Sequence, residues 1–265
     1  KMLTSHQLTY YKTFGVLILR DFLKSDEIAK INSEFESKLT NTLRSTTTPG
    51  HHSYVSWPNL GPDTPYSGSL LEDERICNIA EQLLGGEIYG VSCNSGSFVG
   101  ETQWHPDCED INFRSLKFAF YLQSLNDRNG ALRFIPGSHR NPIHDELLRN
   151  NLRSENPGNV YAHICAVNPG DGVIFDARLW HGSSGGSEDR RLITLIYNRV
   201  PKSADEKEAT LYDMKGSRST RENLAKNTYE SPGPEYHLQW LSEAQKGDRR
   251  QRWINWMKEF GYMDK

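Results

Sequence analysis

The chain has 265 residues with a formal net charge of −3, and 36% of its residues are hydrophobic. This composition excludes a long disordered chain, which would contain fewer apolar residues, and the length suffices to bury a sizeable core without staples. The sequence contains no long basic stripe, so we expect no nucleic-acid partner. It also contains no apolar run near the roughly 18 residues of a membrane span, so we expect no membrane partner.

The four cysteines are far apart in the sequence and show no CxxC spacing. They are Cys77, Cys93, Cys108 and Cys165. This pattern favours reduced thiols over a disulfide framework, and reduced thiols are typical of cytosolic enzymes. We therefore expect a cytoplasmic protein.

Residues 1–86 are predicted to form helices and a loop. An apolar block at Val16–Leu19 indicates a short strand, and Ser25 is a good N-cap for the helix that follows. The segment Thr46–Ser69 is rich in Thr, Ser, Pro and Gly and is predicted to be a long loop. Helical spacing returns over Leu70–Leu84.

Residues 87–200 change to short apolar runs that are separated by turn signals. The runs are Ile88–Ser92, Phe113–Leu122, Leu132–Ile135, Val160–Val167, Gly172–Phe175 and Leu192–Tyr197. Many short strands with turns between them predict a sandwich or a jelly-roll barrel, interrupted by one helix over residues 140–155. Residues 201–265 are predicted to be a helical extension of the same single domain, partly irregular over 202–234.

The strongest local signal for chemistry is the run Gln-Trp-His-Pro-Asp at residues 103–107. In an extended backbone the side chains of His105 and Asp107 fall on one face, so both can address the same point. A second histidine, His181, follows a later apolar strand. Two histidines and one carboxylate are the ligand set of a non-haem Fe(II) site with open positions. An isolated His-x-Asp is also compatible with a surface histidine beside a turn aspartate.

A basic pair follows His181 and opens the last predicted strand. Arg190 or Arg191 can bind a carboxylate through two parallel hydrogen bonds.

Taken in order, these motifs resemble the phytanoyl-CoA dioxygenase family of Fe(II)- and 2-oxoglutarate-dependent oxygenases. The resemblance covers roughly residues 8–200, and its most specific part is the stretch NGALRFIPGSH over residues 129–139. It implies a mainly β fold with flanking helices, namely a double-stranded β-helix, which is a jelly-roll or cupin-like barrel.

The resemblance also assigns roles to six residues. It implies that His105, Asp107 and His181 are the iron ligands and that Arg190, rather than Arg191, pairs with the 5-carboxylate of 2-oxoglutarate. It further implies that Ser183 and Asn94 contact this cosubstrate.

The implied reaction uses Fe(II), 2-oxoglutarate and O₂ to oxidise a C–H bond of a small organic metabolite, releasing succinate and CO₂. Relatives that halogenate carry a small residue in place of the carboxylate ligand, so Asp107 favours hydroxylation, desaturation or ring chemistry. Two other classes remain open. A cupin-type metal enzyme without 2-oxoglutarate has no need of the arginine after His181, and a non-enzymatic barrel binds a ligand without turnover.

Further predictions concern residues outside the motif. We expect Thr46–Ser69 and the segment after Pro201 to form a lid, with Trp57 among the covering aromatic residues. Trp104 and Trp180, which flank predicted ligands, are expected to pack in the core. Arg114 and Lys117 can either meet an anionic substrate or face solvent.

Overall fold

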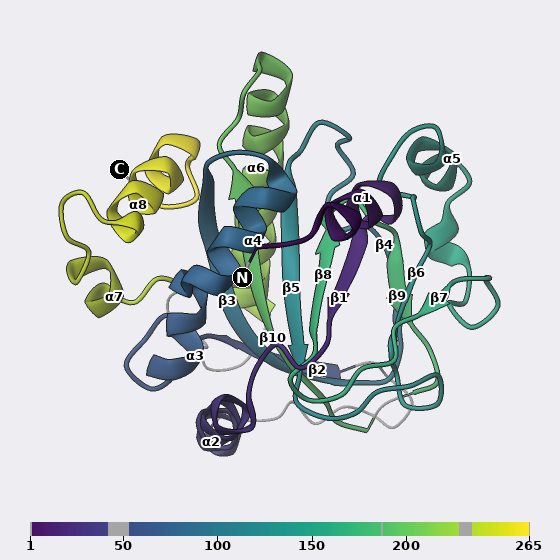
Figure 1. Ribbon diagram of the computed structural model, residues 1–265, viewed down its shortest axis with the longest axis horizontal. Coiled ribbons are helices and arrows are strands. Elements are labelled where there is room, and N and C mark those ends of the chain that lie inside the picture. The colour runs from purple at the N-terminus through teal and green to yellow at the C-terminus, as the bar shows by residue number, and fades with distance from the viewer. Residues whose placement is uncertain (1, 42–52, 187, 228–234, 265) are drawn as a thin grey trace.

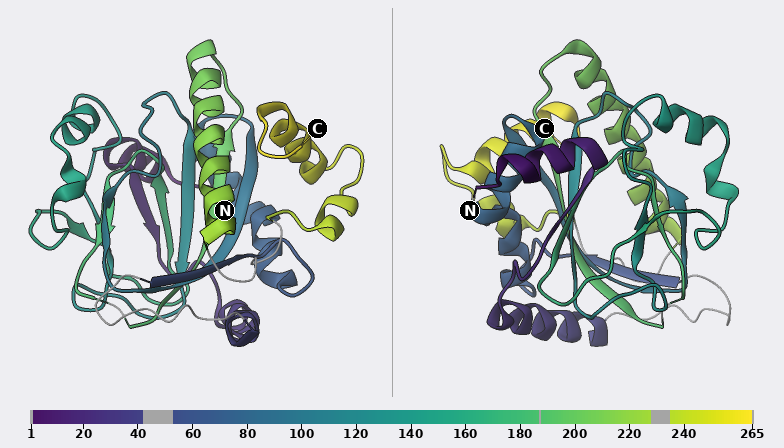
Figure 2. Two further views of the ribbon diagram at one scale, coloured as in Figure 1. Left: turned by 180° about the vertical axis from the view of Figure 1, so that it is seen from behind. Right: turned by 45° about the vertical axis from the view of Figure 1, so that its right-hand side comes forward.

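The computed structural model describes residues 2–41, 53–186, 188–227 and 235–264. The strands are β1 (Val16–Leu19), β2 (Ser53–Pro58), β3 (Ile88–Val99), β4 (Thr102–His105), β5 (Ser115–Tyr121), β6 (Leu132–Phe134), β7 (His163–Ile164), β8 (Gly172–Asp176), β9 (His181–Ser183) and β10 (Arg190–Arg199). They form a six-stranded sheet, in the order β1-β8-β5-β10-β3-β2, and a four-stranded sheet, in the order β4-β9-β6-β7. Figure 1 and Figure 2 show the two sheets facing each other.

The chain winds around the space between the sheets. Strands β8, β9 and β10 lie alternately in the six-stranded, the four-stranded and again the six-stranded sheet. This alternation is the winding of a double-stranded β-helix, so the predicted fold class is confirmed. Both edge strands of the six-stranded sheet, β1 and β2, come from the N-terminal region, so that region supplies strands as well as helices.

Helices flank the sheets on the outside (Figure 1). They are α1 (Ser5–Phe14), α2 (Ser25–Asn41), α3 (Pro65–Ser69), α4 (Glu74–Leu84), α5 (Ile143–Arg149), α6 (Ala204–Asn227), α7 (Leu238–Ser242) and α8 (Arg249–Phe260), with 3₁₀ turns η1 (Leu70–Glu72) and η2 (Leu152–Ser154). The predicted helix over 70–84 is divided because the Asp73 side chain accepts the Arg75 N–H and caps α4. Gly85 ends α4 with φ of 68°, a conformation that glycine adopts without strain.

Two apolar cores result from this arrangement. The outer core lies between α4, α8 and the outer face of the six-stranded sheet, where Ile76 and Trp253 are buried against Tyr197. The inner core lies between the sheets and joins Phe134 of β6 to Phe175 of β8, whose ring centroids are 5.3 Å apart. Each such side chain contributes about 1.5–3 kcal/mol by leaving water. Strands of the six-stranded sheet are therefore covered on both faces.

Within the part that the structure describes, the predicted loop over Thr46–Ser69 is confirmed for residues 59–64 and wrong for residues 53–58 and 65–69, which form β2 and α3. Residues 53–58 form β2, which pairs with β3 from Ser53–Val99 to Pro58–Asn94. The polar composition concealed an edge strand, where proline at the strand end is tolerated. Trp57 is only 2% exposed and packs on Phe35 at 4.9 Å between ring centroids, so it is a core residue and not a cover for the site. Residues 46–52 lie outside the described residues.

Two other predictions need correction. Residues 204–227, expected to be partly irregular, form the continuous helix α6, and residues 228–234 of the predicted excursion are not among those described. The expected strand over Val160–Val167 is reduced to the two residues of β7. The predicted helices after residue 235 and near residues 140–155 are confirmed as α7, α8 and α5.

All four cysteines are buried and unpaired by disulfides. Within the described ranges, no helix combines the length and the apolar character that crossing a bilayer requires.

Candidate metal centre and cosubstrate pocket

The pairing of β4 with β9 brings two histidines from distant parts of the chain together. His105 lies opposite His181, and their ring centroids are 4.4 Å apart. Asp107 follows two residues after β4 ends, and its Oδ1 lies 4.0 Å from Nε2 of His181. One potential ligand atom from each of the three side chains lies within 4.8 Å of the other two. The fold therefore gathers the three residues that the motif predicted as metal ligands.

Backbone carbonyls hold both imidazoles in the same orientation. Nδ1 of His105 lies 2.7 Å from the carbonyl oxygen of Gln103, and Nδ1 of His181 lies 2.8 Å from that of Leu179. Because a carbonyl oxygen can only accept, each Nδ1 donates its hydrogen there. The lone pair of each Nε2 is then left for a metal, an arrangement that is common in metal sites.

The charge states at neutral pH also suit metal binding. Burial and the neighbouring His105 lower the pKa of His181 to about 3, although Asp107 acts in the opposite direction. Burial raises the pKa of the Asp107 carboxyl, but Lys117 and the two imidazoles outweigh it and hold the pKa well below its usual range. The site thus presents a neutral imidazole and an ionised carboxylate, which are the forms that bind metals.

Lys117 is a site residue whose role the sequence left undecided. Its Nζ lies 2.8 Å from Oδ1 and 2.7 Å from Oδ2 of Asp107. On β5 its neighbours Phe118 and Phe120 belong to the outer core, whereas Lys117 points between the sheets. Arg114 differs, because it binds the carbonyl of Ile111 away from this centre.

Arg190 is a buried cation on the same inner surface. Its side chain donates to the carbonyl of Gly130 and to Oγ1 of Thr102, and it stacks over the ring of Phe98 at 5.6 Å. Only 4% of the residue is exposed. Burial lowers the pKa of Arg190, although Tyr121 counteracts this, and a guanidinium remains charged in proteins. No carboxylate among the described residues forms an ion pair with it.

Arg191 lies on the opposite face of β10. It forms ion pairs with Asp189 and with Glu36 of α2, and it stacks over Phe35. Its charge is therefore neutralised within the protein.

The two other predicted cosubstrate contacts also line the inner surface. Ser183 is fully buried, and its Oγ accepts the backbone N–H of Thr102 at 2.9 Å. Asn94 lies opposite Thr194, and its buried Oδ1 has no hydrogen-bond partner. Its neighbour Ser95 bonds to Asn59 on the outer face, so alternation along β3 directs Asn94 inwards.

A buried histidine that the sequence did not single out links the segments carrying the candidate ligands. Nδ1 of His144 lies 3.1 Å from the carbonyl oxygen of Ser138, and Nε2 lies 2.9 Å from that of Glu109, two residues after Asp107. The Ser138 hydroxyl accepts the backbone N–H of Trp180, the residue before His181. The contacts of His144 with Glu109 and of Ser138 with Trp180 have no sequence signal, because each joins residues that are more than thirty positions apart.

Trp104 and Trp180 are both fully buried in one small apolar cluster, which confirms their predicted packing role.

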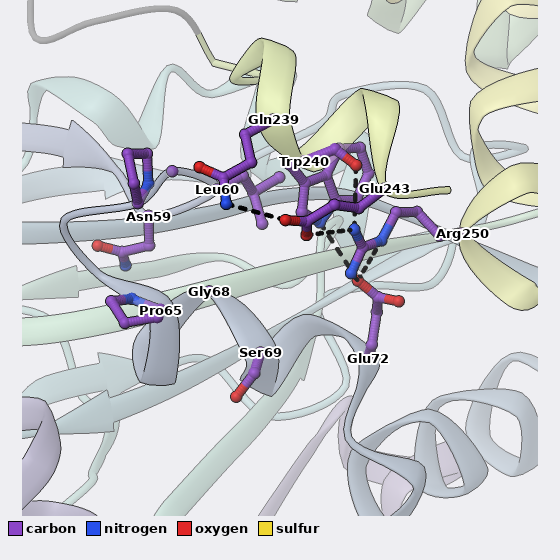
Figure 3. Close-up of a pocket in the computed structure, with 12 residues that line it drawn as sticks. Asn59, Leu60, Pro65, Gly68, Ser69, Glu72, Gln239, Trp240, Glu243 and Arg250 are labelled. Atoms are coloured by element: carbon purple, nitrogen blue, oxygen red, sulfur yellow. Dashed lines mark hydrogen bonds and ion pairs between the residues drawn. The ribbon is translucent and has the colours of Figure 1, made fainter. Parts of the chain in front are cut away.

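A separate cavity of about 150 Å³ lies near α3 and α7 (Figure 3). Its Arg250 donates to Glu72 at 2.8 Å and to the carbonyl of Trp240 at 3.0 Å, and it lies 3.5 Å from Glu243. The charge of Arg250 is therefore paired with two carboxylates, whereas Arg190 forms no ion pair among the described residues.

The fold and this arrangement define a class of protein: a double-stranded β-helix with a two-histidine, one-carboxylate donor set and a buried arginine nearby. The donor set fits a divalent metal of the Fe(II) type, since two Nε2 atoms and one carboxylate converge and leave positions open. The sequence profile of the phytanoyl-CoA dioxygenase (PhyH) family matches residues 11–192. The chain belongs to this family.

Named relatives are similar over most of their length. Ectoine dioxygenase of Bordetella parapertussis is 25% identical over 234 residues, covering 75% of this chain and 76% of the relative. Dioxygenase cdmA of Talaromyces verruculosus is 23% identical over 214 residues, covering 67% of this chain and 66% of the relative.

Solved structures share the fold. EctD from S. alaskensis with 2-oxoglutarate and 5-hydroxyectoine superposes with a TM-score of 0.59 at 25% identity, covering 75% of this chain and 77% of EctD. HygX from Streptomyces hygroscopicus, with nickel and 2-oxoglutarate bound, superposes with a TM-score of 0.62 at 20% identity, covering 76% of this chain and 88% of HygX.

Proposed function

We propose that this protein is an Fe(II)- and 2-oxoglutarate-dependent dioxygenase that hydroxylates a C–H bond of a small organic metabolite. In this reaction one oxygen atom of O₂ enters the product and the other enters succinate, while CO₂ leaves from 2-oxoglutarate. The observation that carries the proposal is the combination of three converging donors with an unpaired, buried Arg190 on the same inner surface. Family membership and the named dioxygenase relatives support it independently.

His105, Asp107 and His181 would hold the iron. When bound, iron(II) supplies the redox chemistry, activating O₂ with electrons from the decarboxylation of 2-oxoglutarate. The carbonyls of Gln103 and Leu179 keep both imidazoles turned towards the metal.

Arg190 would bind the 5-carboxylate of 2-oxoglutarate. The charge-assisted hydrogen bonds and the low exposure of this arginine make it a specific partner for a carboxylate. The Ser183 hydroxyl and the amide NH₂ group of Asn94 would donate hydrogen bonds to the cosubstrate along the same surface.

The buried Arg190 favours this function over its alternatives. A cupin-type enzyme without 2-oxoglutarate gains nothing from an unpaired internal guanidinium, which is costly to bury. The same cost argues against a barrel that only binds a neutral ligand. The carboxylate of Asp107 favours hydroxylation over halogenation, because halogenation needs that metal position for chloride.

The test is anaerobic titration of the protein with Fe(II) and 2-oxoglutarate, followed by measurement of succinate formed on admission of O₂. We expect the parent protein to bind both and to form succinate. The His181→Ala variant should lose Fe(II) binding. It should still unfold cooperatively on heating, as a folded protein does. His163→Ala is the matched control, since His163 lies on β7 at the edge of the same sheet but is exposed. Metal binding by His181→Ala equal to that of the control would refute the assignment.

A further inference from the structure

The contact between Lys117 and Asp107 carries information about the substrate. The Lys117 ammonium lies within 2.8 Å of both carboxylate oxygens, and the two side chains are 20% and 24% exposed. The pair therefore lies where solvent, and hence a substrate, reaches the inner surface. In the metal-free protein Asp107 neutralises Lys117.

Loading the site changes this balance. If Asp107 binds iron, as the proposed function requires, its negative charge is shared with the metal. Iron(II) and the dianion of 2-oxoglutarate cancel each other, and Asp107 cancels one of the two cations Lys117 and Arg190. One positive charge then remains, and Arg190 is matched by the cosubstrate carboxylate. The excess charge is therefore located at Lys117.

Other described charges around the site do not compensate it. Glu109 is paired with Arg153, and Asp189 with Arg191. Asp176, at the end of β8, is paired with Arg178 at 2.6 Å. Lys117 is only 20% exposed, so water compensates its charge incompletely, and a substrate anion is the remaining source of a counter-charge.

We propose that the substrate of this enzyme carries a single carboxylate that pairs with Lys117 beside the metal. The inference rests on the proposed function and adds the substrate class. A carboxylate matches one excess charge, whereas a phosphate monoester dianion would leave a net negative charge. Because Lys117 adjoins Asp107, the carbons next to this carboxylate are held nearest the metal and are the expected positions of oxidation.

The walls around Lys117 agree with a small organic acid. Its partners on the neighbouring strands are Ile196 and Phe175, and the ammonium lies 5.7 Å from the centre of the Phe175 ring. An apolar surface beside a cation accommodates a carboxylate attached to a short carbon skeleton. Thr194 follows at the next inward position of β10 and adds a hydroxyl group.

The test uses propionate as the probe and propionamide as its neutral counterpart. The protein is loaded with Mn(II) and saturating 2-oxoglutarate, and paramagnetic relaxation of the probe protons is measured by NMR. The same protein loaded with Zn(II) provides the diamagnetic reference. We expect propionate to bind about tenfold more tightly than propionamide, as a charge-assisted hydrogen bond requires.

Three variants make the test specific. Lys117→Met should lose the tenfold preference for propionate, and Lys117→Arg should retain most of it. Lys38→Met is the matched control. Lys38 lies on α2, its side chain is 25% exposed, and its Nζ lies 2.6 Å from a carboxylate oxygen of Asp63. This control should bind propionate like the parent.

Two outcomes overturn the inference while leaving the proposed function intact. One is an equal preference for propionate in the parent and in Lys117→Met. The other is a loss of 2-oxoglutarate affinity beyond about tenfold in Lys117→Met, which would assign Lys117 to the cosubstrate. Failure of the parent to bind Mn(II) and 2-oxoglutarate would instead overturn both.

Discussion

Arg190 and Arg191 are adjacent in the sequence, yet their guanidinium groups lie on opposite faces of the six-stranded sheet. Arg190 points between the sheets and has no carboxylate partner among the described residues, whereas Arg191 is paired with Asp189 and Glu36 outside. The alternation of side chains along β10 separates them. One arginine is thus available to a ligand and the other stabilises the contact with α2.

This separation predicts different effects of the same substitution. Arg190→Gln should weaken 2-oxoglutarate binding by about 10- to 100-fold, since hydrogen bonds to a charged group contribute about 1.5–3 kcal/mol. Arg191→Gln should leave that affinity within about threefold and lower the unfolding free energy by about 0–1 kcal/mol, as for other partly exposed pairs. Calorimetric titration and urea denaturation measure the two quantities. A larger loss of affinity in Arg191→Gln would reverse the assignment.

Trp57 should behave as a core residue. It is 2% exposed against Phe35, so Trp57→Ala should lower the unfolding free energy by about 3–5 kcal/mol. Tyr212→Ala, at a residue that is 66% exposed, is the control and should change stability by less than about 0.5 kcal/mol. Urea denaturation distinguishes the two. If Trp57→Ala were as stable as the control, Trp57 would not be a core residue and the predicted lid role would be favoured.

Ser138 should position His181 through the backbone. Ser138→Ala removes the acceptor of the buried Trp180 N–H and should cost about 1–3 kcal/mol of stability. Because Trp180 precedes His181, Fe(II) affinity should fall as well. Ser154→Ala is the control, because it removes an exposed hydroxyl that bonds only to the Asn151 carbonyl. Neither the stability nor the Fe(II) affinity should change in this variant. Unaltered Fe(II) affinity in Ser138→Ala would limit Ser138 to a structural role.

Glu27 should contribute to stability in acid. Hydrogen bonds from Arg75 are the main reason why the pKa of Glu27 is lowered to about 2. Burial raises this pKa, whereas hydrogen bonds from the Lys24 N–H and the Tyr66 hydroxyl lower it further. The folded pKa lies below the unfolded value of about 4.3. The contribution is therefore complete above pH 5 and is lost as the pH falls towards 2. Screening at the half-exposed Arg75 limits it to about 1 kcal/mol.

The contribution of Glu27 is tested by measuring the unfolding free energy of the parent and of Glu27→Gln by urea denaturation across this pH range. The stability difference between them should shrink from pH 6 to pH 2. Glu74→Gln is the control, since the Glu74 side chain is 71% exposed. A difference that stays constant with pH would contradict the assigned contribution of Glu27.

The sequence by itself determined which residue types stand in which order. The pairing of His105 with Asp107 was predicted from local spacing, because two positions along an extended strand already decide that two side chains share a face. The roles of His181 and Arg190 were implied by the order of the motifs, which resembles that of the family. The helix α4 was predicted in part, since its apolar spacing and the Gly85 that ends it lie within a few residues, but the Asp73 cap that starts it at Glu74 was not identified. Such features depend on neighbours in the chain, so they can be derived without knowing the fold.

Only the tertiary structure decided which face of a strand points towards the candidate metal centre and which polar groups find partners. Strands of the six-stranded sheet are covered on both faces, so their apolar pattern did not distinguish an inward Lys117 from one in solvent. The hydrogen bond between His144 and the Glu109 carbonyl and the pairing of β2 with β3 each cross more than thirty residues. These contacts form between residues that are distant in the chain, and their free energy depends on burial and charge that exist only once the sheets have packed.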